Sequence, residues 1–180
     1  MSLVVRSVHT ADLAPDDLAE ARQLMEDVFE GELTPEDWDH CLGGLHVLGR
    51  ENGELVGHAA LVQRHVAYNG RALRAGYVEG LGVRADRRRR GYAGVLMAEV
   101  ERVIDTAYDL GALGASEDGM PFYRQRGWLP WTGPTSALTP GGVVRTADED
   151  GWILVRPGAV ALDTAGGALM VCDWRDGDVW

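Results

Sequence analysis

Apolar residues in the first part of the chain follow helical spacing. Pro15 is followed by two acids and then by apolar residues three and four positions apart, which predicts a helix that begins at Pro15. Thr34, Pro35 and Asp37 predict the start of a second, short helix with Thr34 as its N-cap. A Gly-Gly pair at residues 43–44 is expected to end it.

Two Asn-Gly pairs separate the three apolar runs that follow. Asn-Gly at positions 52–53 and 69–70 is typical of tight β-hairpin turns, so we expect three antiparallel strands in series. Together with an apolar stretch near the start, the predicted strands of this half are Leu3–Val8, Leu45–Gly49, Leu55–Val66 and Ala72–Val83.

A second helical pattern begins after Gly91, with its apolar residues on one face. Because this helix joins strand 72–83 to the apolar segment 110–115, those two strands can lie parallel. Ser116 is expected to cap a short helix that contains Tyr123.

The last part of the chain predicts loop and turn at 133–142, then strands at 152–155 and 168–173. The resulting order is β-α-α-β-β-β-α-β-α-β-β. It predicts an α/β (α+β) fold with a mixed, mostly antiparallel sheet, one parallel pair of strands, and helices on the faces of the sheet. No repeat or linker interrupts residues 1–180, so we expect a single domain.

The positive charge of the chain is concentrated in one place. The net charge is −11, and all 17 basic residues are arginine, with no lysine. Five of these arginines lie between Arg84 and Arg90. An acidic chain with one basic patch argues against general nucleic-acid binding and for a local anionic ligand at the patch. The acidic remainder suits a cationic second ligand.

Several other classes of protein are not favoured. Cys41 and Cys172 are far apart and no CxxC motif occurs, so two reduced thiols are expected. The five histidines show no metal-ligand spacing, so we expect no metal site. No apolar run reaches the roughly 20 residues that span a bilayer, and the first residues lack the pattern of a signal peptide. We therefore expect a cytoplasmic protein that does not bind membranes.

The basic patch joins an apolar strand to a helix. Such a turn leaves the first N–H groups of the helix without partners, and these groups, the helix dipole and nearby arginines make an anion site. Gly80 and Gly82 interrupt the preceding strand, where glycines often mark a bulge or a close backbone approach. We expect this strand to present backbone groups to a ligand; the other interpretation is that the glycines only relieve crowding between a helix and the sheet.

Two nucleotide-binding motifs are excluded at this turn. A Walker A loop needs Gly-Lys-Ser/Thr, and a Rossmann fingerprint needs G-x-G-x-x-G in a first βαβ unit. Neither pattern occurs. Residues 88–93, Arg-Arg-Arg-Gly-Tyr-Ala, instead fit the R/Q-x-x-G-x-G/A signature and resemble the GNAT superfamily of acyl-CoA N-acetyltransferases.

The resemblance implies the GNAT fold and acetyl-CoA (coenzyme A) as co-substrate. In that superfamily the turn binds the pyrophosphate through backbone amides, and the preceding strand pairs with the pantetheine arm. Carried onto this sequence, the residues implied to bind the cofactor are Leu81, Gly82, Val83, Arg88, Arg89, Arg90, Gly91, Tyr92 and Ala93.

Further stretches are similar to aminoglycoside 2′-N-acetyltransferases over nearly the whole chain. They include the Trp38 region with Leu-Gly-Gly-Leu-His at 42–46, Gly-Tyr-Val-Glu-Gly at 76–80, Arg-Gly-Trp-Leu-Pro-Trp at 126–131, and the segment Cys-Asp-Trp-Arg-Asp-Gly-Asp-Val-Trp at 172–180. The resemblance implies acetyl transfer to the 2′-amino group of an aminoglycoside antibiotic, and hence antibiotic resistance. Homodimers are frequent in this family, so a homodimer is expected.

The resemblance also implies three catalytic residues, two candidates for the base and one for the acid. Glu79 takes the amine proton through a water, the terminal carboxylate at Trp180 is a second candidate base, and Tyr123 is the general acid toward the CoA thiolate. The structural alternatives are a solvated or ion-paired glutamate, a frayed chain end and a tyrosine of the helix core.

The polycationic substrate implies a set of acidic and small residues around it, because carboxylates bind ammonium groups by charge-assisted hydrogen bonds. The residues implied to bind the substrate are Glu32, Asp37, Glu79, Gly80, Gly114, Asp148, Glu149 and Asp178. Two positions depart from the pattern of the resembled family: Glu32 replaces an aspartate, and Gly114 and Ala115 stand where serines can occur. These differences concern which substrates are preferred and not the reaction. Two alternatives stay open: a GNAT enzyme for another amine (a protein N-terminus, a polyamine or a cell-wall amine), and a non-enzymatic acyl-CoA-binding domain.

Overall fold

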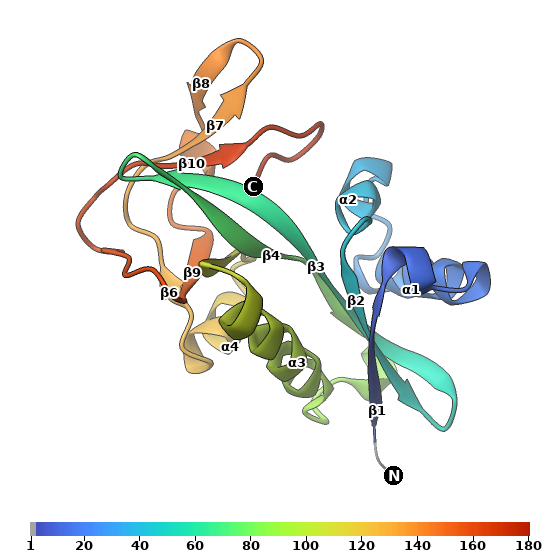
Figure 1. Cartoon of the computed structure of the whole chain (residues 1–180). Helices are drawn as coiled ribbons and strands as arrows, with labels where there is room; N and C mark the ends of the chain where they lie inside the picture. Colours follow the sequence, from blue (N-terminus) through green and yellow to red (C-terminus); the bar gives the residue numbers. More distant parts are fainter. Residues whose placement is uncertain (1–2) are drawn as a thin grey trace. The chain divides into compact units, whose positions relative to one another are not determined.

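The computed structural model describes residues 3–180 (Figure 1). Contacts divide the chain into two compact units. The first unit contains the residues up to Val62 together with Val78–Val103, and the second contains Gln63–Tyr77 and Ile104–Trp180. Three elements contribute residues to both units: β3 (Glu54–Tyr68), β4 (Arg71–Val83) and α3 (Tyr92–Ala107). The single-domain organisation stays a prediction.

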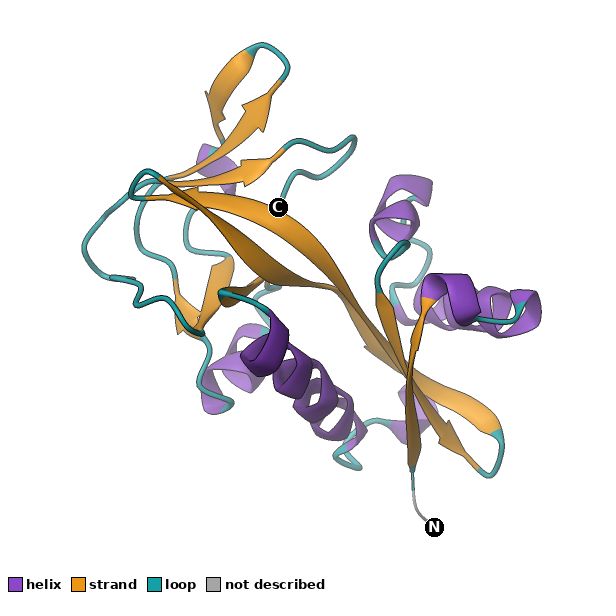
Figure 2. Cartoon of the chain, viewed as in Figure 1, coloured by secondary structure: helices purple, strands orange, loops and turns teal. Residues whose placement is uncertain are grey.

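The first unit has a sheet with helices on both of its faces (Figure 2). Strand β1 pairs antiparallel with β2, and β2 pairs antiparallel with β3. A Cβ added to Gly49 would lie 3.1 Å from Leu96 of α3, whereas the neighbouring Leu48 packs with Met25 of α1. Helices α1 and α3 therefore cover opposite faces. The other elements of this unit are β1 (Val4–His9), η1 (Thr10–Asp12), α1 (Pro15–Val28), α2 (Pro35–His40), β2 (Leu45–Glu51) and η2 (Ala85–Arg87).

The local signals of the first half are confirmed. Thr34 and Asp37 form the capping box at the start of α2, each side chain accepting a hydrogen bond from the backbone of the other. Asn52 and Asn69 have φ values of 53° and 48°, and each precedes a glycine that also has positive φ. Both hairpins therefore have the left-handed turn residues that Asn-Gly predicts.

The second unit is built on one mixed sheet. Its strand order is β6-β9-β5-β4-β3-β10-β7-β8. Strand β5 pairs parallel with β4 and antiparallel with β9, while β10 pairs antiparallel with β3 and parallel with β7. The elements are β5 (Leu110–Gly114), α4 (Met120–Gln125), β6 (Leu129–Pro130), β7 (Thr135–Thr139), β8 (Gly142–Arg145), η3 (Ala147–Glu149), β9 (Ile153–Pro157) and β10 (Met170–Asp173).

Three expectations for the second half are wrong. Residues 133–142 are not all loop, because β7 lies there and forms a hairpin with β8. Its buried positions are Thr135, Ser136 and Ala137, and because two of the three carry hydroxyls, the strand does not show as a run of hydrophobic residues. The sheet has a second parallel pair, β7 with β10. Helix α4 is capped by Gly119 without a side-chain hydrogen bond, and Ser116 closes a turn just before it.

Candidate active site

Strand β4 separates from β5 before it reaches the predicted site. The ladder between them consists of Ala75, Gly76 and Tyr77, which face residues 110–112. Residues 79–83, which include the predicted base and the predicted pantetheine-binding positions, come after the end of this ladder. Backbone groups on that edge of β4 are therefore not paired with β5, as expected for a strand that receives a ligand.

Gly80 and Gly82 have a packing role as well. A Cβ on Gly80 would lie 2.4 Å from Cε of Met25, and one on Gly82 would lie 2.9 Å from Sδ of Met25. Helix α1 thus lies directly on the backbone of β4. The crowding interpretation of the two glycines holds, and it does not conflict with a ligand along the edge of the strand.

Two glycines of β4 pack closely against helices. A Cβ on Gly76 would lie 2.9 Å from Ile104 of α3, and one on Gly80 would lie 2.4 Å from Met25 of α1. A larger residue at either position would require the neighbouring side chains to shift.

The turn before α3 has the backbone of an anion site. Arg89 and Gly91 have positive φ values of 61° and 81°. A hydrogen bond at the start of α3 runs from the N–H of Val95 to the carbonyl of Gly91 at 3.2 Å. The N–H groups of residues 92–94 come before this bond and have no carbonyl to pair with inside the helix. They lie at the positive end of the helix dipole.

Three of the five clustered arginines are held by carboxylates. Arg84 pairs with Asp86 at 3.0 Å and with Glu54 at 3.3 Å. Arg87 donates from Nε to Glu51 at 2.8 Å, and Nη1 of Arg90 lies 3.7 Å from the same carboxylate. Arg84 and Arg87 are therefore held by close carboxylate contacts, whereas Arg90 has a longer one.

Arg88 and Arg89 differ from the other three. Both are exposed, and neither forms an ion pair with a carboxylate in the part of the chain that the structure describes. Arg88 donates from Nε to the carbonyl of Val83 at 3.3 Å, which places its guanidinium beside the end of β4. The turn therefore presents two cations for an anionic ligand, and its residues fit a pyrophosphate.

Glu51 was missed by sequence reasoning, which assigned it only to a hairpin turn. Its side chain is 4% exposed and accepts hydrogen bonds from Arg87 and from the hydroxyl of Tyr92. The Tyr92 hydrogen bond, followed by those of Arg87, lowers the pKa of Glu51. Glu51 thereby ties the end of β2 to the turn and to the first residue of α3.

The remaining predicted residues of the first unit are acids. Glu79 is buried, at 8% exposure, as a carboxylate is only when partners surround it. Asp37 accepts from the N–H of Thr34 at 2.9 Å, so the capping box explains its presence without a substrate. Glu32 is exposed and follows Gly31, whose φ is 84°.

Tyr123 lies on α4 in the second unit. Its ring makes edge contacts with Phe122 and Trp128, with ring centroids 5.2 and 6.2 Å apart. Burial raises the pKa of Tyr123 to about 12, so the phenol keeps its proton throughout the working range of pH. This is the state that a proton donor needs.

Trp180 is docked rather than frayed. Its side chain is buried, and its indole Nε1 donates to Oγ1 of Thr146 at 3.0 Å. Its carbonyl carbon lies 4.0 Å from the Cβ position of Gly114. Two predicted site residues, Gly114 and Trp180, are therefore brought together, and Thr146 is a contact that sequence reasoning missed.

The late acids also gather. Burial raises the pKa of Glu149, and the charges of Asp178 and Asp148 raise it further. Asp148 and Asp178 are exposed while Glu149 is half-buried. Three of the predicted substrate-binding acids therefore interact electrostatically, and a bound cation would relieve their repulsion.

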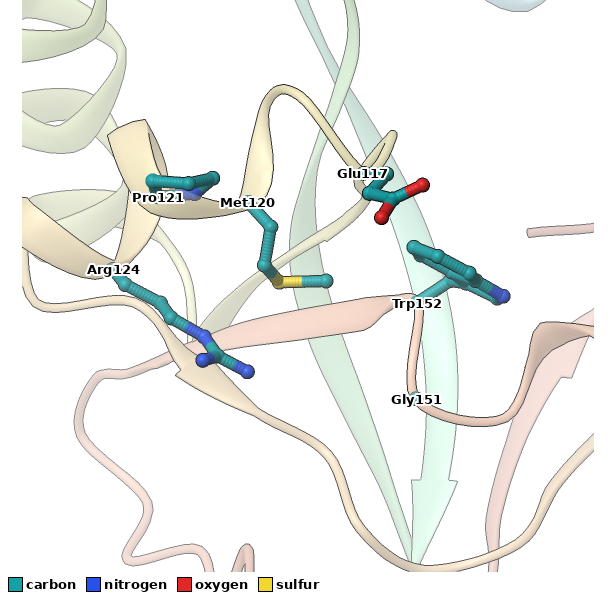
Figure 3. A pocket seen from close by; sticks show the side chains of 6 residues that line it. All are labelled: Glu117, Met120, Pro121, Arg124, Gly151 and Trp152. Carbon is teal, nitrogen blue, oxygen red and sulfur yellow. The ribbon is translucent and has the colours of Figure 1, made fainter.

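A hollow of about 420 Å³ opens beside α4 (Figure 3). The residues that line it are Glu117, Met120, Pro121, Arg124, Gly151 and Trp152. Tyr123, although on the same helix, does not line it.

Within residues 3–180 no group of three or more His, Cys, Asp or Glu side chains could hold a metal ion. No helix in this range is long and apolar enough to cross a membrane.

On an α+β fold, the chain combines a strand whose ladder with β5 ends early and a turn that leaves N–H groups without partners at a helix start. Residues 9–130 match the family model described as an acetyltransferase (GNAT) domain. The chain belongs to the GNAT acetyltransferase family, has its fold, and uses acetyl-CoA as acyl donor.

A curated relative is similar to this chain over nearly its whole length. The chain is 48% identical over 179 residues to an aminoglycoside 2′-N-acetyltransferase of Mycolicibacterium fortuitum, which covers 97% of this chain and 91% of the relative.

Solved structures agree on the fold. The GNAT protein YhbS of Escherichia coli in complex with CoA has a TM-score of 0.65 at 17% identity, over 97% of this chain and 90% of that one. Eis1 of Mycobacterium abscessus has a TM-score of 0.60 at 20% identity over 75% of this chain, which spans about a third (32%) of the Eis1 chain.

Proposed function

We propose that this protein transfers acetyl from acetyl-CoA to the 2′-amino group of an aminoglycoside antibiotic and so confers resistance. The main support for this choice of substrate is the 48% identity, over 97% of the chain, to an enzyme named for that reaction. The interacting acids Asp148, Glu149 and Asp178 support a polycationic substrate. The proposed enzyme is cytoplasmic. It is also proposed to be a homodimer, and light scattering on a gel-filtration column would test this oligomeric state.

Acetyl-CoA supplies the activated acyl group. The N–H groups of residues 92–94 and the cations of Arg88 and Arg89 are proposed to hold its pyrophosphate, with Arg90, Gly91, Tyr92 and Ala93 shaping the turn. The unpaired edge of β4 at Leu81, Gly82 and Val83 is proposed to hold the pantetheine arm. Both assignments use backbone donors, which need no side-chain rearrangement to bind an anion or an amide.

The amine must lose a proton before or during its attack on the thioester, because an ammonium has no lone pair. We assign this role to Glu79, acting through a water, with the carboxylate at Trp180 as the second candidate. Two observations support the assignment: Glu79 is buried, and it follows directly after the part of β4 that pairs with β5. Docking of Trp180 supports the second candidate, because an ordered tail can hold a group in place.

Tyr123 is proposed to stabilise the departing thiolate. The phenol pKa of about 12 lies above that of an ordinary thiol, about 8.5, so complete proton transfer is uphill by about 5 kcal/mol. Its main contribution is therefore a hydrogen bond donated to the sulfur as negative charge builds, with the proton delivered late or by solvent.

The substrate is proposed to bind through carboxylates and through backbone at glycines. The acids are Glu32, Asp37, Glu79, Asp148, Glu149 and Asp178, and the glycines are Gly80 and Gly114. Among the acids, Glu149 and its two neighbours have the strongest support, because their mutual repulsion is relieved by a cation. Asp37 has the weakest, because its carboxylate already caps α2.

The test is release of the CoA thiol with a panel of amines. Gentamicin, tobramycin and kasugamycin offer a 2′-amine, whereas amikacin carries a hydroxyl at 2′ and serves as the matched negative. A peptide panel and spermidine represent the other amines. Turnover with the first three drugs and acetylation at the 2′ nitrogen by NMR are expected. Turnover confined to peptides or spermidine, or CoA binding without turnover, would overturn the proposal.

A further inference from the structure

Arg64 on β3 is a buried cation whose role the proposed chemistry does not explain. Its side chain is only 4% exposed. Burying a guanidinium is costly unless nearly every N–H finds a partner. The groups that Arg64 bonds therefore indicate what its side chain orders.

The guanidinium of Arg64 makes three hydrogen bonds, all to the last part of the chain. Nε donates to Oδ1 of Asp173 at 2.8 Å, and Nη2 donates to the backbone carbonyl of Asp173 at 2.7 Å. Nη1 donates to the backbone carbonyl of Val179 at 2.7 Å. One side chain thus joins the end of β10 to the residue before Trp180, across six positions of chain.

Arg175 closes the same segment from within. Its Nε donates to the carbonyl of Asp178 at 2.6 Å, and its Nη2 donates to a main-chain oxygen of Trp180 at 3.2 Å. Both guanidiniums lie near the ring of Tyr77, with Cζ of Arg64 5.0 Å and Cζ of Arg175 5.5 Å from its centroid. Tyr77 belongs to β4, two residues before Glu79.

We infer that Arg64 is a positioning residue for the amine substrate, acting through residues 174–180, which we name the tail. It fixes the tail so that Asp178 and Trp180 are presented in one arrangement. The planar fork of arginine suits this role, since it bonds a carboxylate and two carbonyls at once, whereas lysine offers a single point charge. The inference rests on the proposed function for the identity of the amine.

The first measurement is hydrogen exchange of the tail in the protein alone, for wild type and Arg64→Lys. Exchange of the amides of residues 174–180 is expected to rise about tenfold or more, because two charged hydrogen bonds are lost or weakened. The matched control is Arg156→Lys, which breaks a two-point arginine–carboxylate pair with Asp105 (2.7 and 2.8 Å) in the same unit, away from the tail. The control is expected to leave tail exchange within twofold of wild type.

The second measurement is the kinetic split. For Arg64→Lys the KM for tobramycin is expected to rise about tenfold, while the KM for acetyl-CoA changes less than twofold. A merely structural role would lower active enzyme without changing one KM selectively. If Arg64→Lys fails to fold, Asp173→Asn weakens the same link and is expected to change both readouts in the same direction.

The two possible failures are distinguishable. Unchanged tail exchange in Arg64→Lys and Asp173→Asn, or an equal rise in Arg156→Lys, overturns the inference whatever the substrate is. Faster tail exchange with an unchanged tobramycin KM also overturns it, because the tail would then be ordered without positioning the amine. Failure of the wild-type protein to acetylate any 2′-amine overturns the proposed function, whereas the exchange experiment needs no substrate.

Discussion

Glu51, at the end of β2, accepts a hydrogen bond from the hydroxyl of Tyr92, the first residue of α3. The same carboxylate accepts from Arg87. The turn that is proposed to bind pyrophosphate is therefore fixed at both ends by one buried acid. The charge of an acid so close to an anion site weakens binding of the ligand, whereas its ordering of the turn strengthens binding. The effect of removing the charge on the KM for acetyl-CoA shows which contribution is larger.

Glu51→Gln is expected to raise the KM for acetyl-CoA about three- to tenfold with kcat nearly unchanged. Ordering outweighs charge because Arg89 and Gly91 need their positive φ values, which a loosened turn does not keep. Initial rates at varied acetyl-CoA measure it, with Glu54→Gln, at the exposed partner of Arg84, as control. A fall in KM would mean that Glu51 acts mainly through its charge.

Arg88 and Arg89 are expected to contribute more to acetyl-CoA binding than Arg84 does. Substituting either by alanine is expected to raise the KM for acetyl-CoA about five- to tenfold and to reduce its dependence on salt, since each exposed cation contributes about 1 kcal/mol. Arg84→Ala, which removes an arginine already paired with Asp86 and Glu54, is expected to change it less than twofold. Equal effects of all three would show that only the overall charge of the patch matters.

Tyr123→Phe is expected to reduce kcat about a hundredfold with the KM for acetyl-CoA within twofold. The ring contacts with Phe122 and Trp128 are kept, so the loss reports the hydroxyl. Because the pKa of Tyr123 is about 12, the wild-type rate is expected to show no loss from its ionisation up to pH 10. If turnover and CoA binding were weakened equally, Tyr123 would not act as the proton donor in the reaction.

His46 and His58 are expected to make the first unit sensitive to acid. Their ring nitrogens lie 2.9 Å apart, and Nδ1 of His58 has no hydrogen-bond partner within the described chain. Burial, with a smaller contribution from His9, lowers the pKa of His46 to about 4, and burial with His46 lowers that of His58 to about 3. At neutral pH both rings are uncharged, folded or unfolded.

Below pH 6.5 the two histidines bind protons in the unfolded chain but remain neutral in the folded protein. Stability is therefore lost as pH falls from about 6.5 to about 4. His46 alone accounts for about 3 kcal/mol of the free energy of unfolding over that range. Urea unfolding at pH 7.5 and 5.0 measures the upper part of this loss, about 2 kcal/mol from His46. His58→Leu is expected to reduce the difference and His65→Gln, on an exposed ring, to leave it unchanged. No pH dependence in wild type would contradict the buried neutral pair.

Local chemistry explains which parts of the fold could be predicted from the sequence. The Asn-Gly turns, the Thr34 capping box and the anion turn are set by residues next to one another in the chain. Strand β7 could not be predicted, because its buried Thr135 is satisfied by Thr146 and Asp150, partners that only folding brings near. For the same reason Glu51 and Arg64, whose partners lie 41 and 115 residues away, were not visible as site residues.

The arginine-only composition has a chemical consequence at the turn. A bound thioester is a reagent for any neutral amine within reach, and a lysine beside it would supply one when deprotonated. Guanidinium groups keep their proton up to about pH 12 and are poor nucleophiles. Since no lysine occurs in the chain, the cations that are proposed to hold the acyl donor are chemically inert toward it. The protein can therefore keep acetyl-CoA bound while it waits for an amine without acetylating its own side-chain amines.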